Sequence, residues 1–359
     1  MKIISVVGTR PQFIKLAALT EKISRAPFKK NFLHKTIHTG QHYDYEMSRI
    51  FFQQLSIPEP DYNLNVGSNS PSKQIGRMME GIEEILLKEK PDIVVVYGDT
   101  NSTLAGALSA SHLHIPVAHV EAGLRSFNME MPEEINRILT DKVSSLLFSP
   151  TETAVRNLKR EGQTKNVFLV GDVMYDIFLY SQEFLENRKI LQDLSLAPKE
   201  YLLLTIHRKE NIQKIQRTIS IIESLAKLKE TVVFPVHPGA RKILEQNGCH
   251  LKKFYNIRAI NPVGYLDMLY LEKNARKIIT DSGGVQKEAY WSNVPCIVLR
   301  EETEWKELTS FNMTLVGSDI NRLLEEIKKP VTRCRYQADI FGKGNASVLI
   351  LKQLLKSHE

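Results

Sequence analysis

Cysteine and long apolar segments are both scarce in this 359-residue chain. Its three cysteines, Cys249, Cys296 and Cys334, are odd in number and far apart, which indicates neither a disulfide framework nor a CxxC zinc site. We therefore expect a reducing compartment, the cytoplasm. The first apolar run, residues 3–7, is followed at once by a Gly-Thr-Arg-Pro turn, so it predicts a β-strand and not a signal peptide. No later run approaches membrane-spanning length, so no membrane partner is expected.

Metal-binding and nucleic-acid-binding patterns are also missing. The sequence holds no HExxH, no DxD group of oxygen ligands and no paired Cys/His spacing, so we predict no metal site. The net charge is +7, but the lysines and arginines are dispersed, often alternate with acids, and form no aromatic-basic stripe. We expect no nucleic-acid partner. The positive excess fits a solvated surface together with cations for a small polyanionic ligand.

What the chain does have is a regular alternation of short apolar runs and amphipathic stretches. Its composition, 42% hydrophobic and 25% charged, is that of a globular protein, and its length predicts two domains. The apolar runs are continuous, which indicates strands buried on both faces and hence an α/β fold with parallel sheets. Helices are expected at 73–88 and 133–142. The apolar runs are residues 3–7, 92–98, 116–123, 166–172, 201–207, 231–238, 276–284 and 294–300.

This alternation restarts near residue 201, after a charged, helix-prone segment at 176–198. The restart predicts two doubly wound, Rossmann-like domains that face each other across a cleft, with a hinge near 171–176. We place the N-terminal domain at 1–171 and the C-terminal domain at 172–344. An amphipathic closing helix is expected at 345–359.

The first strand leads into "GTRPQFIK", which is not a standard nucleotide loop. Gly8 stands alone, whereas a Rossmann fingerprint needs three spaced glycines and a P-loop needs a second glycine before its lysine. Arg10, the start of a helix at Pro11 and Lys15 one turn later would suit a phosphate held by charge and by the helix dipole. A plain strand-turn-helix with two solvated cations fits the same residues equally well.

Polar residues follow the apolar runs repeatedly, at the sheet edge where open α/β folds bind ligands. A single one would be a cap or a satisfied polar group, but six in corresponding places indicate a ligand site. They are Arg10, Asp99, Glu121, His207 with Arg208, His237 and the turn Asp281–Gly284.

Two helix starts can also contribute. In "DSGG", Ser282, Gly283 and Gly284 would expose backbone N–H groups as a diphosphate cradle, although an ordinary N-cap is the alternative. Glu288, in the same helix, could reach a ribose or lie on the surface. In "PEEINR", Glu133 or Glu134 either caps the helix or points into the cleft, where Arg137 would keep such an acid ionised or bind substrate.

Taken together, the motifs resemble those of the non-hydrolysing UDP-N-acetylglucosamine 2-epimerases. They occur in order along essentially the whole chain: "GTRPQFIK", "GDTNSTLAGAL", "HVEAGLRS", "MPEEINR", "PTETAVRNLKREG", "HRKEN", "HP", "DSGGVQKEA" and "REETE". The resemblance implies a GT-B fold of two Rossmann-like domains with the active site between them. It also implies a last helix that crosses back to complete the N-terminal domain, and a homodimer whose products feed surface polysaccharide or lipopolysaccharide synthesis.

The family reaction explains the residue types. UDP leaves C1 as a base removes the C2 proton, and UDP then re-adds to the glycal with a proton delivered to the opposite face, without a cofactor. By resemblance, Asp99, Glu121 and Glu133 match the acidic catalytic set, with base and acid unassigned, and His207 assists the departure of UDP. The matching substrate or UDP contacts are Arg10, Lys15, Arg137, His237, Ser282, Gly283, Gly284 and Glu288.

Three motifs depart from the common family pattern. "GTRPQ" replaces GTRPE, "SFNMEMPEE" replaces a longer segment, and "EETEWKEL" replaces TTERPE, with Trp305 where an arginine is expected. These variants resemble the branch that acts on UDP-2,3-diacetamido-2,3-dideoxyglucuronic acid, which we favour slightly over UDP-N-acetylglucosamine. They also argue against the allosteric site of some bacterial members. The competing functions are a GT-B glycosyltransferase and a non-catalytic nucleotide-sugar sensor.

Overall fold

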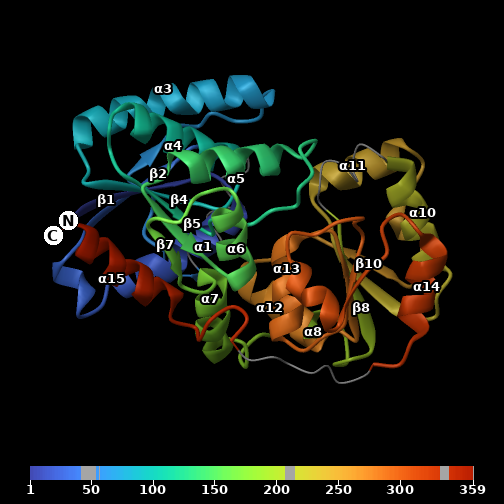
Figure 1. Ribbon diagram of the computed structural model, residues 1–359. Helices are drawn as coiled ribbons and strands as arrows, with labels where there is room; N and C mark the ends of the chain where they lie inside the picture. The colour runs from blue at the N-terminus through green and yellow to red at the C-terminus, as the bar shows by residue number, and fades with distance from the viewer. Residues whose placement is uncertain (42–53, 56, 207–214, 332–338, 359) are drawn as a thin grey trace. The chain divides into compact units, whose positions relative to one another are not determined.

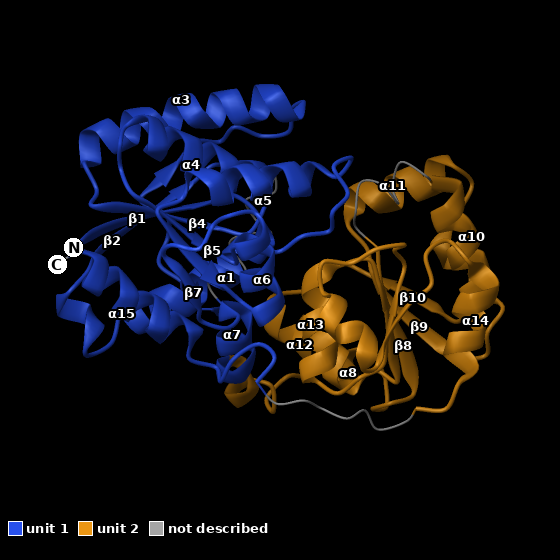
Figure 2. Ribbon diagram, in the orientation of Figure 1, with its two compact units in different colours: residues 1–180, 338–359 blue, residues 181–337 orange. Residues whose placement is uncertain are grey.

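The computed structural model describes residues 1–41, 54–55, 57–206, 215–331 and 339–358. The chain divides into two compact units, Met1–Tyr180 with Ala338–Glu359, and Ser181–Gln337 (Figures 1 and 2). The sequence placed the boundary after residue 171, whereas the observed division also brings the following helix, α7 (Val173–Ser181), largely into unit 1.

Unit 1 is built on a parallel sheet of seven strands in the order β3-β2-β1-β4-β5-β6-β7, counted over the described residues. The central strands are buried and consist mostly of Val, Ile and Ala, because helices cover both faces of the sheet. The strands are β1 (Lys2–Val7), β2 (Leu33–His38), β3 (Tyr62–Asn63), β4 (Ile93–Tyr97), β5 (Val117–Val120), β6 (Leu146–Ser149) and β7 (Val167–Leu169).

The helices of unit 1 connect these strands in the doubly wound manner. They are α1 (Arg10–Ile23), α3 (Pro71–Glu89), α4 (Asn101–His112), α5 (Pro132–Val143), α6 (Glu152–Arg160), α7 and α15 (Ala346–His358), with a 3₁₀ turn at Phe28–Lys30. The last helix packs against α1. Asp176 of α7 fixes its start, because its carboxylate accepts hydrogen bonds from the backbone N–H groups of Ala346 and Ser347 at 3.0 and 2.8 Å.

Unit 2 repeats the scheme: its described residues form six parallel strands in the order β10-β9-β8-β11-β12-β13. These strands are β8 (Tyr201–Thr205), β9 (Thr231–Pro235), β10 (Ile257–Ile260), β11 (Lys277–Thr280), β12 (Cys296–Val298) and β13 (Met313–Leu315). The helices are α8 (Ile190–Asp193), α10 (Ile215–Ala226), α11 (Pro238–Gln246), α12 (Tyr265–Asn274), α13 (Gly283–Trp291) and α14 (Ile320–Lys328), with 3₁₀ turns at Gln182–Phe184, Leu251–Lys253 and Lys306–Ser310.

Both sheets reverse their strand order at one point, between β1 and β4 in unit 1 and between β8 and β11 in unit 2. Ligands of open α/β sheets bind beside the carboxyl ends of strands at such a switch point. The predicted turns at Gly8–Lys15, Gly98–Asp99 and Asp281–Gly284 follow β1, β4 and β11, so the fold places them at these positions.

Candidate functional site

The turn after β1 is fixed by Gln12, the residue at which the first motif departs from the family pattern. Its side-chain oxygen accepts hydrogen bonds from the N–H groups of Gly8 and Thr9 at 2.8 and 3.1 Å. Its amide nitrogen donates to the Tyr97 carbonyl and to Thr103 Oγ1, both at 3.0 Å. A carboxylate could not make the bond to the Tyr97 carbonyl, because it carries no hydrogen, and could bond Thr103 only by accepting from its hydroxyl. Glutamine therefore ties the β1 turn to the end of β4.

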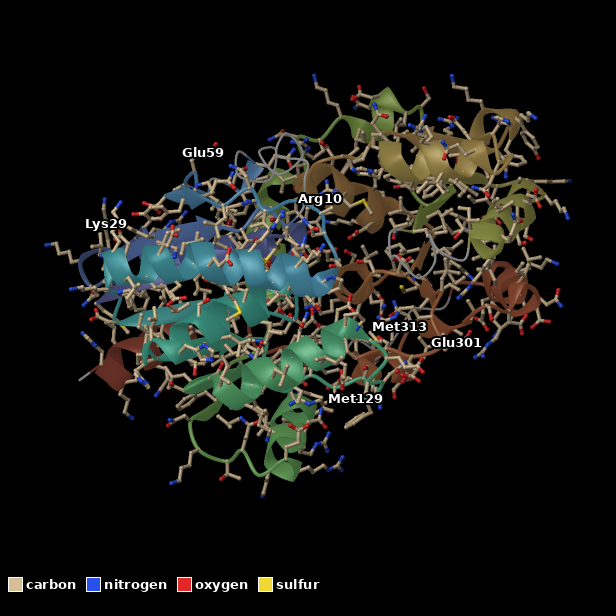
Figure 3. The ribbon with its side chains drawn as sticks, turned by 90° about the horizontal axis from the view of Figure 1, so that it is seen from above. Arg10, Lys29, Glu59, Met129, Glu301 and Met313 are labelled. Atoms are coloured by element: carbon tan, nitrogen blue, oxygen red, sulfur yellow. The ribbon has the colours of Figure 1, made fainter. Side chains whose placement is uncertain are left out.

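Arg10 and Lys15, the predicted phosphate-binding cations, lie on the same helix in different surroundings. Arg10 is the first residue of α1 and is partly exposed (Figure 3). Lys15 is buried, and its Nζ lies 2.7 Å from Glu121 Oε1, so two predicted site residues form an ion pair. Gly98 allows this approach, because a β-carbon there would lie 2.8 Å from Lys15 Nζ.

Asp99 and Arg137 are also brought together. Arg137 Nη2 donates to Asp99 Oδ2, while Arg137 Nη1 lies 2.7 Å from Glu134 Oε2. Asp99 remains partly exposed, whereas Arg137 is almost fully buried. The arginine therefore presents one side of its guanidinium to an accessible carboxylate and is anchored on the other by a buried one.

The choice that the sequence left open between Glu133 and Glu134 has a structural answer. Glu134 is fully buried and accepts hydrogen bonds from the N–H groups of Ser126 and Phe127, both at 2.9 Å, as well as from Arg137. It therefore holds the segment that precedes α5. Glu133 is only half-buried, so of the two it is the carboxylate that solvent or a ligand can reach.

The turn after β11 forms the N-terminus of helix α13. Ser282 is the N-cap of α13, and its Oγ accepts from the Val285 N–H at 3.4 Å. The residues Ser282, Gly283 and Gly284 are partly exposed, while Glu288, one helical turn further on, is buried. Burial and the neighbouring carboxylate of Glu288 raise the pKa of the buried Glu272 well above its ordinary value.

His237 is exposed and is the N-cap of α11. Its Nδ1 accepts the Gly239 N–H at 3.1 Å, which leaves Nε2 as the nitrogen that carries the hydrogen in the neutral ring. His207 and Arg208 lie outside the described residues.

Trp305, the residue that stands where the family pattern has an arginine, packs against helix α13. It is buried, and the ammonium of Lys287 lies 4.1 Å from the centre of its ring. Beside it, Arg300 Nη1 pairs with Glu304 Oε2 at 2.8 Å. The expected cation is thus replaced by an aromatic ring that packs on a lysine from the neighbouring helix.

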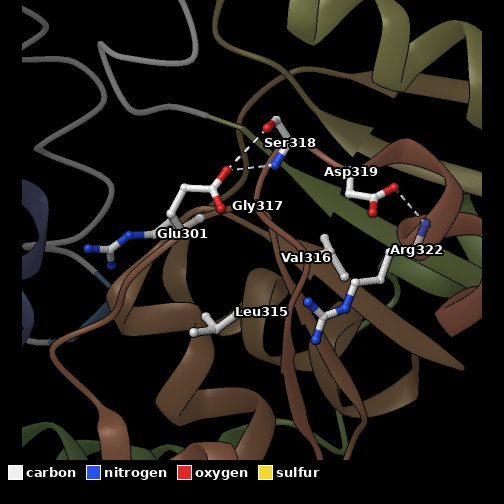
Figure 4. Close-up of a pocket in the computed structure, with 8 residues that line it drawn as sticks. Glu301, Leu315, Val316, Gly317, Ser318, Asp319 and Arg322 are labelled. Carbon is white, nitrogen blue, oxygen red and sulfur yellow. Dashed lines mark hydrogen bonds between the residues drawn. The ribbon is translucent and has the colours of Figure 1, made fainter.

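A separate pocket lies in unit 2 at the carboxyl ends of β12 and β13 (Figure 4). Glu301 accepts hydrogen bonds across it from Ser318 N and Oγ at 3.0 and 3.1 Å. The residues that line it are Arg300, Glu301, Leu315, Val316, Gly317, Ser318, Asp319 and Arg322. Arg300 and Glu301 belong to the "REETE" motif, but the sequence analysis gave none of these side chains a role.

Two buried side chains to which the sequence analysis gave no role, His119 and Asp141, lie beneath the acidic turns. His119 Nδ1 is 2.7 Å from Asp141 Oδ1, and its Nε2 is 2.7 Å from the Gly98 carbonyl. The available signal was a histidine inside an otherwise apolar strand, where a polar side chain needs a specific partner.

Metal clusters and membrane-spanning helices are both absent from the part of the chain that the structure describes. Among these residues no cluster of three or more His, Cys, Asp or Glu could hold a metal ion. None of the described helices combines the length and apolar character needed to cross a membrane.

Comparison with known proteins identifies the family. The sequence profile of the family described as UDP-N-acetylglucosamine 2-epimerase matches residues 26–355. The chain belongs to this family. The resemblance, the isomerase assignment and the fold of two Rossmann-like units expected from the sequence are thereby confirmed.

The similar proteins cover both substrate branches. A UDP-N-acetylglucosamine 2-epimerase homolog of Methanococcus maripaludis is 53% identical over 99% of both chains. The UDP-2,3-diacetamido-2,3-dideoxy-D-glucuronate 2-epimerase of Pseudomonas aeruginosa is 44% identical over 99% of this chain and 100% of its own. The Methanocaldococcus jannaschii UDP-GlcNAc 2-epimerase, solved with UDP-GlcNAc and UDP, has a TM-score of 0.91 at 43% identity and covers 99% of this chain and 100% of its own.

Proposed function

We propose that this epimerase inverts C2 of a UDP-2-acetamido sugar by elimination and re-addition of UDP. The C2 hydrogen is not next to a carbonyl, so a side-chain base cannot remove it alone. Anti elimination breaks the C2–H and C1–O bonds together: the proton goes to a protein base and the C1–O electrons leave with UDP. UDP then re-adds to C1 of the glycal as C2 takes a proton on the opposite face.

Three carboxylates are proposed to handle protons and positive charge on the sugar: Asp99, Glu121 and Glu133. The observation that carries the proposal is the pairing of Asp99 with Arg137 and of Glu121 with Lys15 at the switch point of unit 1. The two ion pairs hold the Glu121 and Asp99 carboxylates in fixed positions, and a carboxylate can accept a proton or stabilise a cationic C1.

The residues of unit 2, with Arg10, are proposed to bind UDP. Ser282, Gly283 and Gly284 offer backbone N–H groups at the start of α13 to the diphosphate, and Glu288 would accept hydrogen bonds from the ribose hydroxyls. His237 would donate from Nε2 to a phosphate, since Nδ1 already accepts from the backbone. His207 is proposed to assist the departure of UDP.

For the sugar itself, we propose the 2,3-diacetamido glucuronate, with UDP-N-acetylglucosamine as the alternative. The support is the set of motif variants at Gln12, before Glu133 and at Trp305. We further propose that the enzyme is a cytoplasmic homodimer that needs no cofactor and supplies sugars for surface polysaccharide or lipopolysaccharide.

The test uses conservative amide variants of two proposed catalytic acids. Asp99→Asn and Glu133→Gln are expected to abolish epimerisation while UDP still binds, because the UDP contacts lie on other residues. Glu130→Gln, an exposed acid three residues before Glu133, is the matched control and should keep full activity. Epimerisation by both acid variants at the wild-type rate would refute the assignment. Transfer of the sugar to an added acceptor would instead favour a glycosyltransferase.

A further inference from the structure

The loops that carry Asp99 and Glu121 share one buried polar support. His119, on β5, and Asp141, on α5, are both fully buried. His119 Nε2 lies 2.7 Å from the carbonyl of Gly98, the residue before Asp99. Asp141 Oδ2 accepts the N–H of Gly123, two residues after Glu121, at 3.2 Å. The two side chains are joined at 2.7 Å, so one hydrogen-bonded pair reaches both loops.

The hydrogen-bond partners show which atoms of this pair donate and which accept. The Gly98 carbonyl can only accept, so Nε2 of His119 carries a hydrogen. Oδ2 of Asp141 also accepts hydrogen bonds from the Gly123 N–H and from Arg125, whose Nη1 lies 2.8 Å away. Oδ1 of the same carboxyl group faces Nδ1 of His119 at 2.7 Å. The ring spans from a fixed carboxylate to a single backbone carbonyl and has no further polar atom to offer.

The backbone that this pair holds has left-handed φ angles, which glycine adopts freely but which strain Glu121. Gly98 has a φ of +65°, Glu121 of +76° and Gly123 of +85°. A residue other than glycine held in this region costs on the order of 1–3 kcal/mol and persists only where its surroundings fix it. The surroundings of Glu121 include hydrogen bonds from its own N–H and that of Ala122 to the Phe148 carbonyl, both at 3.0 Å. Asp141 fixes the other end of this turn by accepting the Gly123 N–H.

We propose that His119 and Asp141 are positioning residues that set the Asp99 and Glu121 carboxylates relative to each other for proton transfer. The inference rests on the proposed function, in which these two acids act on the sugar. Neither His119 nor Asp141 is exposed to solvent, so they act through the two loops and not on the substrate. Substitution of His119 or Asp141 should therefore slow the chemical step and leave the affinity for UDP unchanged.

Two substitutions of His119 separate its two hydrogen bonds. His119→Gln places an amide N–H near the position of Nε2 and keeps the bond to Gly98. His119→Asn places its amide near Nδ1, so it keeps the bond to Asp141 and loses the one to Gly98. Displacement of a catalytic group by about 1 Å can cost about 100-fold in rate. We expect kcat to fall about 100-fold in His119→Asn and no more than about tenfold in His119→Gln.

The test measures kcat, KM, the dissociation constant for UDP, and the kinetic isotope effect with substrate deuterated at C2. His119→Asn should lower kcat with KM and UDP affinity unchanged, and its isotope effect should exceed that of the wild type, because proton transfer becomes more rate-limiting. Asp141→Asn should change the same quantities in the same direction. It serves as the second variant if His119→Asn does not fold, as judged by circular dichroism.

Equal kcat values for His119→Gln and His119→Asn, or loss of kcat and UDP affinity together in folded protein, would overturn the positioning role. An unchanged isotope effect in a slow variant would also overturn it. Failure of the proposed function gives a different result: the wild type itself would bind UDP but release no C2 proton, and the inference would fall with it.

Discussion

The Lys15–Glu121 ion pair gives the sharpest prediction about stability. The side chains are 7% and 8% exposed, and Nζ and Oε1 are 2.7 Å apart. At an effective dielectric constant of about 20, the Coulomb attraction over this distance is roughly 6 kcal/mol, much of which offsets the cost of desolvating both charges. Lys15→Met removes the cation but leaves the carboxylate buried. We expect a loss of about 3–5 kcal/mol in the free energy of unfolding.

A double-mutant cycle tests this reasoning without substrate. In Lys15→Met/Glu121→Gln no uncompensated charge is buried, so the double variant should be more stable than Lys15→Met alone, with a coupling energy of about 2–3 kcal/mol. Each 1 kcal/mol corresponds to about 2–4 °C in the unfolding midpoint of a unit of this size, which circular dichroism resolves easily. Strictly additive effects, or a loss below about 1 kcal/mol in Lys15→Met, would refute the claim that the pair is buried and coupled.

Three further predictions concern other parts of the chain. Asp176→Ala removes the acceptor at the start of α15 and should lower the free energy of unfolding of unit 1 by about 1–3 kcal/mol in urea titration; an unchanged midpoint would contradict this. Hydrogen bonds from Lys2, Tyr62 and Lys35 lower the pKa of Glu89 to about 2, so its contribution to stability is complete above about pH 4.5 and disappears as the pH falls toward 2. The stability advantage of the wild type over Glu89→Gln should therefore be present at pH 7 and absent at pH 2, and a constant difference would refute it. Burial raises the pKa of the Cys296 thiol, so Cys296 should react with a thiol reagent only after unfolding, as followed by mass spectrometry of the labelled peptide, and rapid labelling of native protein would contradict its burial.

The central strands of both sheets could be predicted from the sequence, because burial on both faces leaves continuous apolar runs. Each of the eight identified runs coincides with a strand. Apart from β1, which begins one residue before its run, the strands are shorter than the runs: 276–284, for example, holds β11 at Lys277–Thr280 and the turn after it. The sequence did not identify β2, β3, β6, β10 or β13. The outer strand β3 has only two residues, and β2 and β10 mix polar with apolar residues, so their signals are weak.

The structure places Asp99, Glu121 and Ser282 just after strands, as the sequence predicted, but their side-chain partners could not be predicted. Their role in a site stays a prediction, based on the rule that ligands bind at the carboxyl ends of parallel strands. Which of Glu133 and Glu134 is buried depends on Ser126 and Phe127, whose N–H groups lie in a loop that no helix periodicity describes. Partnerships such as His119 with Asp141 join residues 22 positions apart, and only the packing of α5 on β5 brings them together.

The central claim is that this chain epimerises C2 of a UDP-sugar through proton exchange with solvent. Proton NMR of the protein in heavy water tests it directly, with UDP-2,3-diacetamido-2,3-dideoxyglucuronic acid in one tube and UDP-N-acetylglucosamine in another. We predict deuterium at C2 together with the manno epimer, first in the uronate tube. Unchanged spectra in both tubes, with no UDP released, would contradict the assignment.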